Sequence, residues 1–209
     1  MKTIIIAITN RSSYNKVKTV IEYLLTKDDI QLYIMLGGSV LLYKYGSVGN
    51  LIGEDFPSVP ILNISLAVEG DSLDKMSKTV GLGVIEISTI FSTVKPDFVV
   101  TVADRFETLA TAIAASYANI PLIHLQGGET TGSIDNKVRN AITQLADYHF
   151  TATELSAYRV SLMKMNGFTR VYPWGCPSMD LLNRYSLLPN SSDNLHHSHL
   201  PFRIEVDDL

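Results

Sequence analysis

The stretch HLQGGETTGSID, residues 124–135, gathers side chains that can transfer protons into a dozen positions. His124, Glu129 and Asp135 are residue types that act as general acids or bases in enzymes. The stretch directly follows an apolar run, IPLI, which predicts a strand buried in the protein interior. We therefore expect a reaction site at the point where this strand ends.

Two adjacent glycines, Gly127 and Gly128, lie in the middle of this stretch. Glycine permits a turn with positive φ and lets the backbone pass close to a ligand. The two-residue period of a strand places His124 and Gln126 on one side of it. We expect Gln126 and the two glycines to contact a substrate.

The ionisable residues of this stretch also have structural explanations. His124 could be a core histidine, Asp135 could cap the following helix, and Arg139 could be the ion-pair partner of Asp135. Ser133 could start the same helix. The joint occurrence of these groups around a double glycine nevertheless favours a site, in which Arg139 would bind substrate.

A second polar cluster, ADRFETLA, follows the apolar run at residues 98–102. Asp104 could act as an acid or base, or could cap the next helix. Arg105 carries a planar guanidinium suited to phosphate oxygens, although it could equally form an ion pair with Glu107 or Glu129. We expect Asp104 to be catalytic and Arg105 to bind substrate.

Apolar patterns alternate along the chain between strand-like and helix-like periods. We expect strands at 3–8, 31–36, 61–66, 98–102, 121–125 and 149–152, and helices at 17–25, 71–94, 109–116, 137–145 and 154–165. Such alternation predicts an α/β protein with a doubly wound, Rossmann-like parallel sheet. Ligands of these sheets bind beyond the carboxyl ends of the strands, so the loops at 9–14, 37–38, 103–107 and 124–135 should converge on one edge.

Composition excludes several classes of function. The net charge of −4 offers no basic surface for nucleic acid. The apolar run at residues 4–8 is too short to cross a membrane, and no export signal follows it. Cys176 cannot form an internal disulfide because the chain has no other cysteine, which agrees with a cytoplasmic location.

Two further signals carry little weight. Gly81 and Gly83 resemble part of a dinucleotide fingerprint, but they lie within an expected helix, so we expect no nicotinamide cofactor. The tail after residue 182 loses its periodicity, and its histidines, His196, His197 and His199, lack other ligands at metal-binding spacing. We expect no metal and no cofactor, one domain at residues 1–185, and a linker or the start of a second domain at 186–209.

The motifs DRFE, GGE followed by IDxxxR, and GCPS, together with TNRSSY near the amino end, are similar to those of the hydrolysing UDP-N-acetylglucosamine 2-epimerases. The resemblance covers the chain to about residue 183. It implies the first half of a glycosyltransferase-B architecture, in which two Rossmann-like domains enclose the active site. It also implies a UDP-hexosamine substrate and a homodimer or higher homo-oligomer. Candidate contact residues are Leu73, Met76, Val80 and Ile87, although packing in the core would explain these apolar residues equally well.

The reaction that this resemblance implies is elimination of UDP to give a glycal, followed by hydration to the free 2-epimer. Asp104 and Asp135 would transfer protons, and Arg11 and Arg105 would orient the sugar and diphosphate. Glu129 and His124 would shape the pocket. Because the second domain supplies most nucleotide contacts in this family, we expect the 209-residue chain alone to be inactive or nearly so.

The sequence departs from the family at two positions. Gln126 replaces a glutamate that is catalytic in several relatives, and Asn140 replaces a histidine. These differences leave open a relative acting on UDP-2,4-diacetamido-2,4,6-trideoxy-glucose in the legionaminic acid pathway. A glycosyltransferase of the same architecture and a non-catalytic binding module are further alternatives.

Overall fold

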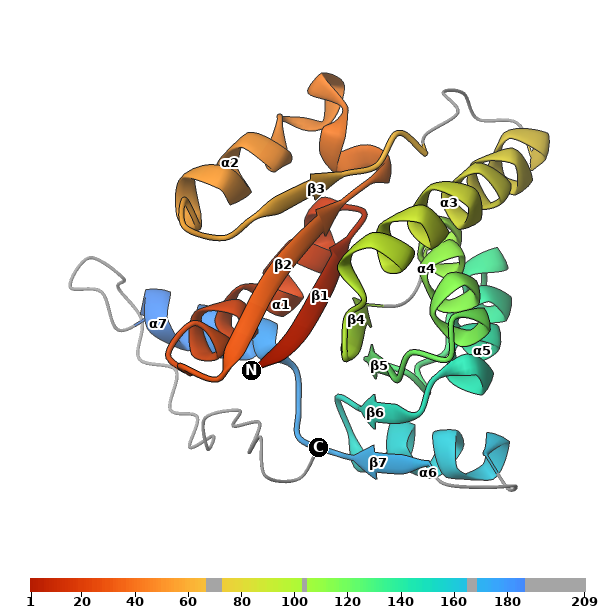
Figure 1. Cartoon of the computed structure of the whole chain (residues 1–209). Coiled ribbons are helices and arrows are strands. Elements are labelled where there is room, and N and C mark those ends of the chain that lie inside the picture. The colour runs from red at the N-terminus through yellow and green to blue at the C-terminus, as the bar shows by residue number, and fades with distance from the viewer. Residues whose placement is uncertain (67–72, 103–104, 165–168, 187–209) are drawn as a thin grey trace.

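The computed structural model describes residues 1–66, 73–102, 105–164 and 169–186. Within these residues, parallel strands form one sheet in the order β3-β2-β1-β4-β5-β6-β7 (Figure 1). The strands are β1 (Lys2–Ile8), β2 (Ile30–Leu36), β3 (Ile61–Asn63), β4 (Phe98–Val102), β5 (Leu122–Leu125), β6 (Tyr148–Phe150) and β7 (Arg170–Tyr172). The doubly wound, Rossmann-like sheet expected from the sequence is confirmed.

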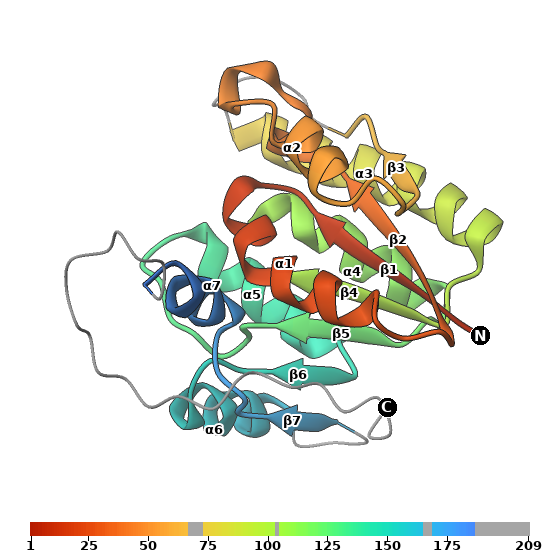
Figure 2. The same cartoon turned by 90° about the vertical axis from the view of Figure 1, so that its left-hand side faces the viewer.

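Helices cover both faces of the sheet (Figures 1 and 2). They are α1 (Arg11–Leu24), α2 (Val48–Asp55), α3 (Leu73–Val94), α4 (Phe106–Tyr117), α5 (Ile134–Leu145), α6 (Glu154–Met163) and α7 (Pro177–Ser186), with short 3-10 helices η1 (Gly38–Leu41) and η2 (Tyr43–Tyr45). One face carries α1 and α2, with α7 packed against α1; the other carries α3, α4 and α5. No helix among the described residues is long and apolar enough to span a membrane.

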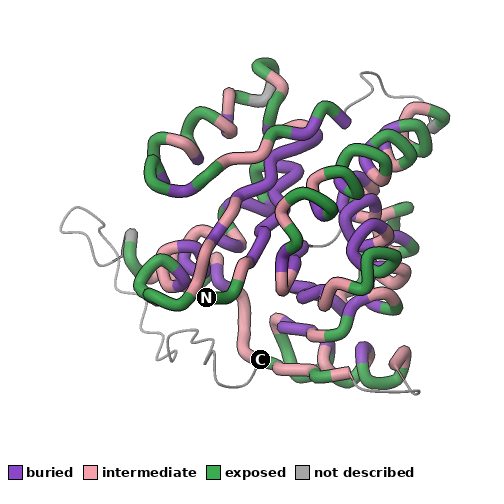
Figure 3. The backbone as a smooth tube through the Cα atoms, in the orientation of Figure 1, coloured by how far each residue is buried: buried purple, intermediate pink, exposed green. Residues whose placement is uncertain are grey.

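The continuous apolar sequence of β1 explains how the sheet buries both faces. Ile4, Ile6 and Ile8 face the α1 layer, whereas Ile5 and Ala7 face the α3 and α4 layer. Figure 3 shows the central strands as buried and the outer sides of the helices as exposed. Burying each isoleucine side chain contributes about 1.5–3 kcal/mol, so this strand is a principal source of stability.

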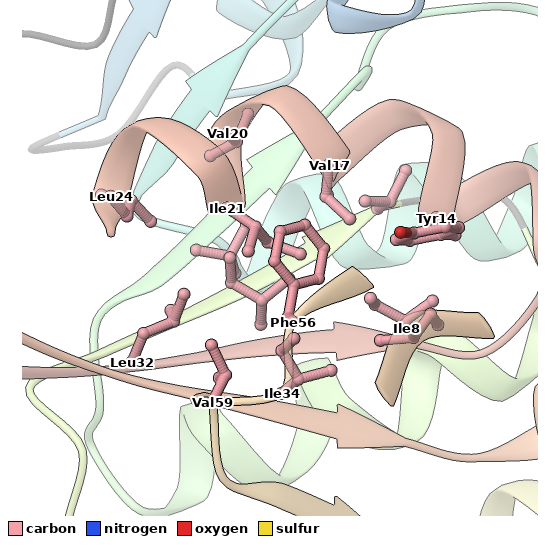
Figure 4. Close-up of a cluster of buried hydrophobic side chains, with 14 of the residues drawn as sticks. Ile8, Tyr14, Val17, Val20, Ile21, Leu24, Leu32, Ile34, Phe56 and Val59 are labelled. Atoms are coloured by element: carbon pink, nitrogen blue, oxygen red, sulfur yellow. The ribbon is translucent and has the colours of Figure 1, made fainter. Parts of the chain in front are cut away.

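The amphipathic helix α1 packs on one face of the sheet and begins just after the carboxyl end of β1. Val17 and Ile21 point from α1 toward the strands, and Phe56 fills the space beside them (Figure 4). The Asn10 side chain caps α1 by accepting a hydrogen bond of 2.9 Å from the backbone N–H of Ser13. The cap fixes where the helix begins and therefore where its first residues lie.

Several elements differ from the sequence prediction. The strand expected at 61–66 ends at Asn63, although Ile64 and Leu66 are still buried. Helix α2, strand β7 and helix α7 were not predicted, and α7 continues to Ser186, beyond the point where periodicity fades. Residues 187–209, with the three tail histidines and nearly all of the expected linker, lie outside the described residues.

The apolar face of α3 that was expected to join subunits is largely part of the core. Ile87 is fully buried, and Val80 packs against the same cluster, so these residues stabilise the fold of one chain. Leu82 and Ile85 of α3 are apolar side chains that are exposed to solvent. The interface expectation was therefore wrong for Ile87, whereas for the half-buried Val80 it stays a prediction.

Candidate functional site

The carboxyl ends of β2, β1, β4 and β5 lie side by side because these strands are adjacent and parallel. The chain moves outward through β2 and β3 on one side of β1, and through β4 and β5 on the other. The strand order therefore reverses between β1 and β4, which is where open α/β sheets bind ligands. We refer to the loops at this edge, residues 9–11, 37–39, 105–107 and 126–135, as the rim.

The loops after β1 and β2 meet at Gly38, whose φ is +63°. A Cβ atom at Gly38 would lie 2.9 Å from the Thr9 carbonyl oxygen and 3.5 Å from Oε1 of Glu107. The Ser39 hydroxyl donates to the Thr9 carbonyl over 3.2 Å, and the hydroxyls of Thr9 and Thr108 are 3.4 Å apart. These contacts confirm that three of the expected loops converge.

Glu107 places a buried carboxylate at this junction. Its side chain accepts from Nε of Arg105, at 3.2 Å to Oε2 and 3.4 Å to Oε1. The ion pair considered from sequence is therefore with Glu107 and not with Glu129. The Arg105 side chain is 47% exposed, so its guanidinium remains accessible to an anion while Glu107 lies beneath it. Asp104 lies outside the described residues.

Arg11 is the first residue of α1 and is exposed at the rim. The amino-terminal end of a helix carries partial positive charge, which favours anions such as phosphate. Its expected role as a binding residue stays a prediction.

Gln126 ends β5 in an unusual conformation. Its φ is +62°, and its backbone N–H donates to the Phe150 carbonyl over 2.7 Å. The buried side-chain amide donates to Sγ of Cys176 over 2.6 Å. His124 instead contacts Thr143 of α5, so the expectation that Gln126 and His124 share one side was wrong. The left-handed backbone at Gln126 interrupts the two-residue period.

At the double glycine, neighbouring protein atoms fill the space that side chains would occupy. A Cβ at Gly127 would lie 3.0 Å from Nδ1 of His124 and 3.2 Å from Oγ1 of Thr143. At Gly128, whose φ is +79°, it would lie 2.2 Å from the carbonyl oxygen of Ser156 in α6. The expected positive φ is confirmed at Gly128, but close packing against α5 and α6 explains both glycines without a substrate.

Two arginines hold this turn through its carbonyl groups. Nη1 of Arg139 donates to the Glu129 carbonyl over 2.9 Å and lies 3.5 Å from Oγ1 of Thr131. Nη1 of Arg159 donates to the Gly128 carbonyl over 3.3 Å. Arg139 is fully buried, so the expectation that it binds substrate conflicts with its position inside the protein.

Helix α5 begins as one of the sequence alternatives predicts. Ser133 is the N-cap and its hydroxyl accepts from the backbone N–H of Asp135 over 3.2 Å. The half-buried Asp135 carboxylate also receives the Ser133 hydroxyl at 3.2 Å, so an ion pair with Arg139 is not what holds it. Asp135 therefore lies at the rim in the first turn of α5, where negative charge is favoured.

Two histidines lie beneath the turn on neighbouring strands. The His124 and His149 rings are 5.7 Å apart between centroids and are fully buried. Burial, with smaller effects of His149 and Arg139, holds the pKa of His124 well below its usual range. Burial and the nearby Lys164 ammonium lower the pKa of His149 to about 4, an effect that the Ala146 backbone partly offsets. Both imidazoles are therefore neutral near pH 7.

Two hollows on the surface are lined by residues outside the rim. A hollow of about 490 Å³ near the ends of β2 and β3 is lined partly by Ser47, Asn50 and Asn63. Another, of about 590 Å³, lies between α1, α2 and α7 and includes Lys18 and Asp55. Among the residues described, no group of three His, Cys, Asp or Glu side chains could hold a metal ion.

Some residues that organise the site were not predicted from the sequence. Glu107 was considered only as an ion-pair partner, although an acidic residue in the first turn of an otherwise apolar helix is a usable signal. Cys176 was considered only for its inability to form an internal disulfide, whereas its Sγ accepts a hydrogen bond from the Gln126 amide. Arg159 gave no signal because its contact joins residues 31 positions apart.

Comparison with known proteins agrees with this geometry. A family model described as UDP-N-acetylglucosamine 2-epimerase matches residues 24–202. The chain belongs to the UDP-N-acetylglucosamine 2-epimerase family.

Relatives refine the likeness. The chain is 36% identical over 186 residues to the UDP-N,N'-diacetylbacillosamine 2-epimerase (hydrolyzing) of Legionella pneumophila, covering 88% of this chain and 48% of that protein. It is 33% identical over 138 residues to the GDP/UDP-N,N'-diacetylbacillosamine 2-epimerase (hydrolyzing) of Campylobacter jejuni, covering 66% and 35%. The chain thus spans about half the length of the Legionella relative and a third of that from Campylobacter.

Solved structures support the fold. The UDP-GlcNAc 2-epimerase of Neisseria meningitidis, determined bound to UDP-GlcNAc, superposes with a TM-score of 0.74 at 19% identity, covering 90% of this chain and 50% of that one. The described sheet therefore corresponds to about half of a two-domain structure of the glycosyltransferase-B kind.

Proposed function

We propose that this chain forms part of a hydrolysing 2-epimerase that acts on a UDP-N-acetyl-hexosamine and releases UDP and the free 2-epimer, such as N-acetylmannosamine. The observation that carries the proposal is its 36% identity, across 88% of the chain, to a relative named as hydrolyzing. The gathering of Arg11, Arg105, Glu129 and Asp135 at one sheet edge supports it.

The proposed reaction has two steps. In the first, a base removes the proton from C2 of the sugar, a C1–C2 double bond forms, and the bond from C1 to the diphosphate oxygen breaks with its electron pair leaving on UDP. In the second, water adds its hydroxyl to C1 and a proton returns to C2 from the opposite face. The chemistry requires a base, an acid and a cationic environment for the leaving group.

The rim offers groups for each requirement. We assign the proton transfers to Asp104 and Asp135, of which Asp135 is half-buried in the first turn of α5. Arg11, the first residue of α1, and Arg105, the N-cap of α4, are exposed cations that would orient the sugar and the diphosphate. The helix amino-terminal ends beside them add further positive potential.

Glu129 and His124 would shape the pocket. The Glu129 backbone is held by the buried Arg139, so we assign Arg139 to supporting this turn in place of substrate contact. Gln126, whose neutral amide is bonded to Cys176, would not act as a base.

A diacetamido sugar is the second candidate substrate. The Legionella and Campylobacter relatives are both named for UDP-N,N'-diacetylbacillosamine, which favours UDP-2,4-diacetamido-2,4,6-trideoxy-glucose. The proposal also includes a cytoplasmic location and a homo-oligomer, for which the exposed Leu82 and Ile85 of α3 are candidate contact residues.

The test is release of UDP from both nucleotide sugars, with the sugar product identified by NMR. We would assay the 209-residue chain alone and fused to the second half of the Legionella relative. The expected result is free UDP and a free 2-epimer from the fusion, with little turnover by the chain alone. UDP release with transfer of the sugar to an acceptor would instead indicate a glycosyltransferase, and binding without turnover would indicate a binding module.

Matched variants separate the assigned residues from general effects. Asp104→Asn and Asp135→Asn should each lower kcat by at least about a hundredfold. Asp28→Asn, at the opposite edge of the sheet, is the control and should keep full activity. Unchanged activity in both rim variants would contradict the assignment.

A further inference from the structure

A row of buried polar side chains crosses three neighbouring strands just below the rim. Thr101 of β4 is the register partner of His124 of β5, which is the partner of His149 of β6. All three side chains are fully buried, on the face of the sheet covered by α4 and α5. The next register partner of Thr101, on β1, is Ala7, so the polar row ends there.

The surroundings of the row oppose a positive charge on it. Among the residues described, nothing offers a hydrogen bond to Nε2 of His124 or to Oγ1 of Thr101. An imidazolium needs an acceptor for both of its N–H groups, and His124 has the Thr143 hydroxyl near Nδ1, at 3.3 Å. The charged groups facing the pair include two cations, Arg139 and Lys164.

The counter-charge near the row is limited. Burial lowers the pKa of Lys164, and the negative charge of Asp147, directly before β6, partly offsets this effect. The lowered pKa values of His124 and His149 follow from the same desolvation. The row is therefore neutral across the physiological pH range.

The ring of His124 lies on the side of the turn where a side chain at position 127 would project. A side-chain atom added at Gly127 would lie 3.0 Å from Nδ1 and 3.1 Å from Cε1 of His124. The turn is held at its carbonyls by Arg139 and Arg159. The imidazole thus occupies the space next to Gly127 that a larger side chain at this position would need.

We propose that His124 is a positioning residue for the turn 127–129: a neutral imidazole, fixed in one tautomer beside Thr143, that supports the turn from below. It transfers no proton itself. The idea that the turn positions the Glu129 carboxylate rests on the proposed function. The support of the turn by His124 does not depend on that function.

The first test reads the imidazole directly. Nitrogen-15 NMR of the histidine-labelled chain, recorded without ligand between pH 5 and 8, should show His124 as one neutral tautomer with no titration. Thr143→Val should change the His124 nitrogen shifts, because it removes the hydroxyl beside Nδ1. A His124 that titrates near pH 6.5, or shifts unaffected by Thr143→Val, would overturn the proposal.

The second test reads the turn. Amide hydrogen exchange at residues 127–129 should speed up at least tenfold in His124→Leu and should return toward the wild-type rate in His124→Asn, whose amide can replace Nδ1. His149→Leu is the control and should leave these amides unchanged. If His124→Leu fails to fold, the exchange rates of His124→Asn and Thr143→Val can be compared instead. Equal exchange rates at residues 127–129 in all variants would refute the proposal.

Catalysis gives a third, separable readout. In the UDP-release assay, His124→Asn should lower kcat more than it changes KM, and both limbs of the pH–rate profile should stay in place. Loss of a limb would mean that His124 transfers a proton. Because the NMR and exchange measurements use no nucleotide sugar, failure of the epimerase assay and failure of this proposal are distinguishable.

Discussion

Lowering the pH from 8 to 5 should weaken the fold measurably through His149. The pKa of His149 is about 4 in the folded chain, compared with its ordinary value of 6.5 in an unfolded chain. The unfolded chain therefore binds the proton first as the pH falls. Stability is therefore full above the unfolded pKa and is lost progressively down to about pH 4. Between pH 8 and 5 this single group should lower the free energy of unfolding by about 2 kcal/mol. Urea unfolding at the two pH values measures the loss.

His149→Leu isolates the contribution of this side chain. Leucine has a similar volume and does not titrate, so the drop between pH 8 and 5 should be smaller by about 2 kcal/mol than in the wild type. His124 remains in the variant, and its lowered pKa acts in the same direction in both proteins. Asp55 and Asp97 have lowered pKa values and contribute at more acidic pH. The same pH dependence in both proteins would refute the reasoning.

Glycine and cap substitutions test the packing by urea unfolding. Gly128→Ala should destabilise the chain by about 3 kcal/mol, since a Cβ there would lie 2.2 Å from a backbone oxygen of α6, whereas Gly132→Ala, with nothing within 4 Å, should change little. In α3, Gly81→Ala should stabilise the chain by about 0.5–1 kcal/mol. Gly83→Ala should destabilise it, because the added Cβ would lie 2.8 Å from a methyl group of α4. Equal effects of the two substitutions would contradict the close packing of α3 against α4. Asn10→Ala should lower the free energy of unfolding by about 1 kcal/mol, and Asn10→Asp should lower it much less. Equal stability of the two variants would mean that the cap of α1 is unimportant.

The sequence predicted the central elements because their patterns are long and strong. The strand at 98–102 was placed correctly, since five consecutive strand-forming positions precede a helix with its own period. Helix α2 was missed because its eight residues include two glycines, and β7 because three residues carry no readable period. Their positions depend on packing against elements far away in the sequence.

The rim could be located from sequence, but the roles of its residues could not. Parallel topology alone brings the loops at 9–11, 105–107 and 126–135 to one edge. Arg139 has the sequence context of an anion ligand, yet it lies inside the protein and bonds a carbonyl. Gly128 is required by a helix 28 residues further along the chain, a contact that no local pattern reveals.

The central claim is that the rim receives a nucleotide-linked sugar, and amide chemical-shift mapping tests it most directly. The nitrogen-15-labelled chain would be titrated with UDP-N-acetylglucosamine and with the diacetamido UDP-sugar, using UDP-glucose for comparison. We expect shifts at residues 9–11, 37–39, 105–107 and 126–135, and we expect them to be larger with the acetamido sugars than with UDP-glucose. Shifts gathered in the hollow between α1, α2 and α7, or no shifts at millimolar ligand, would contradict it.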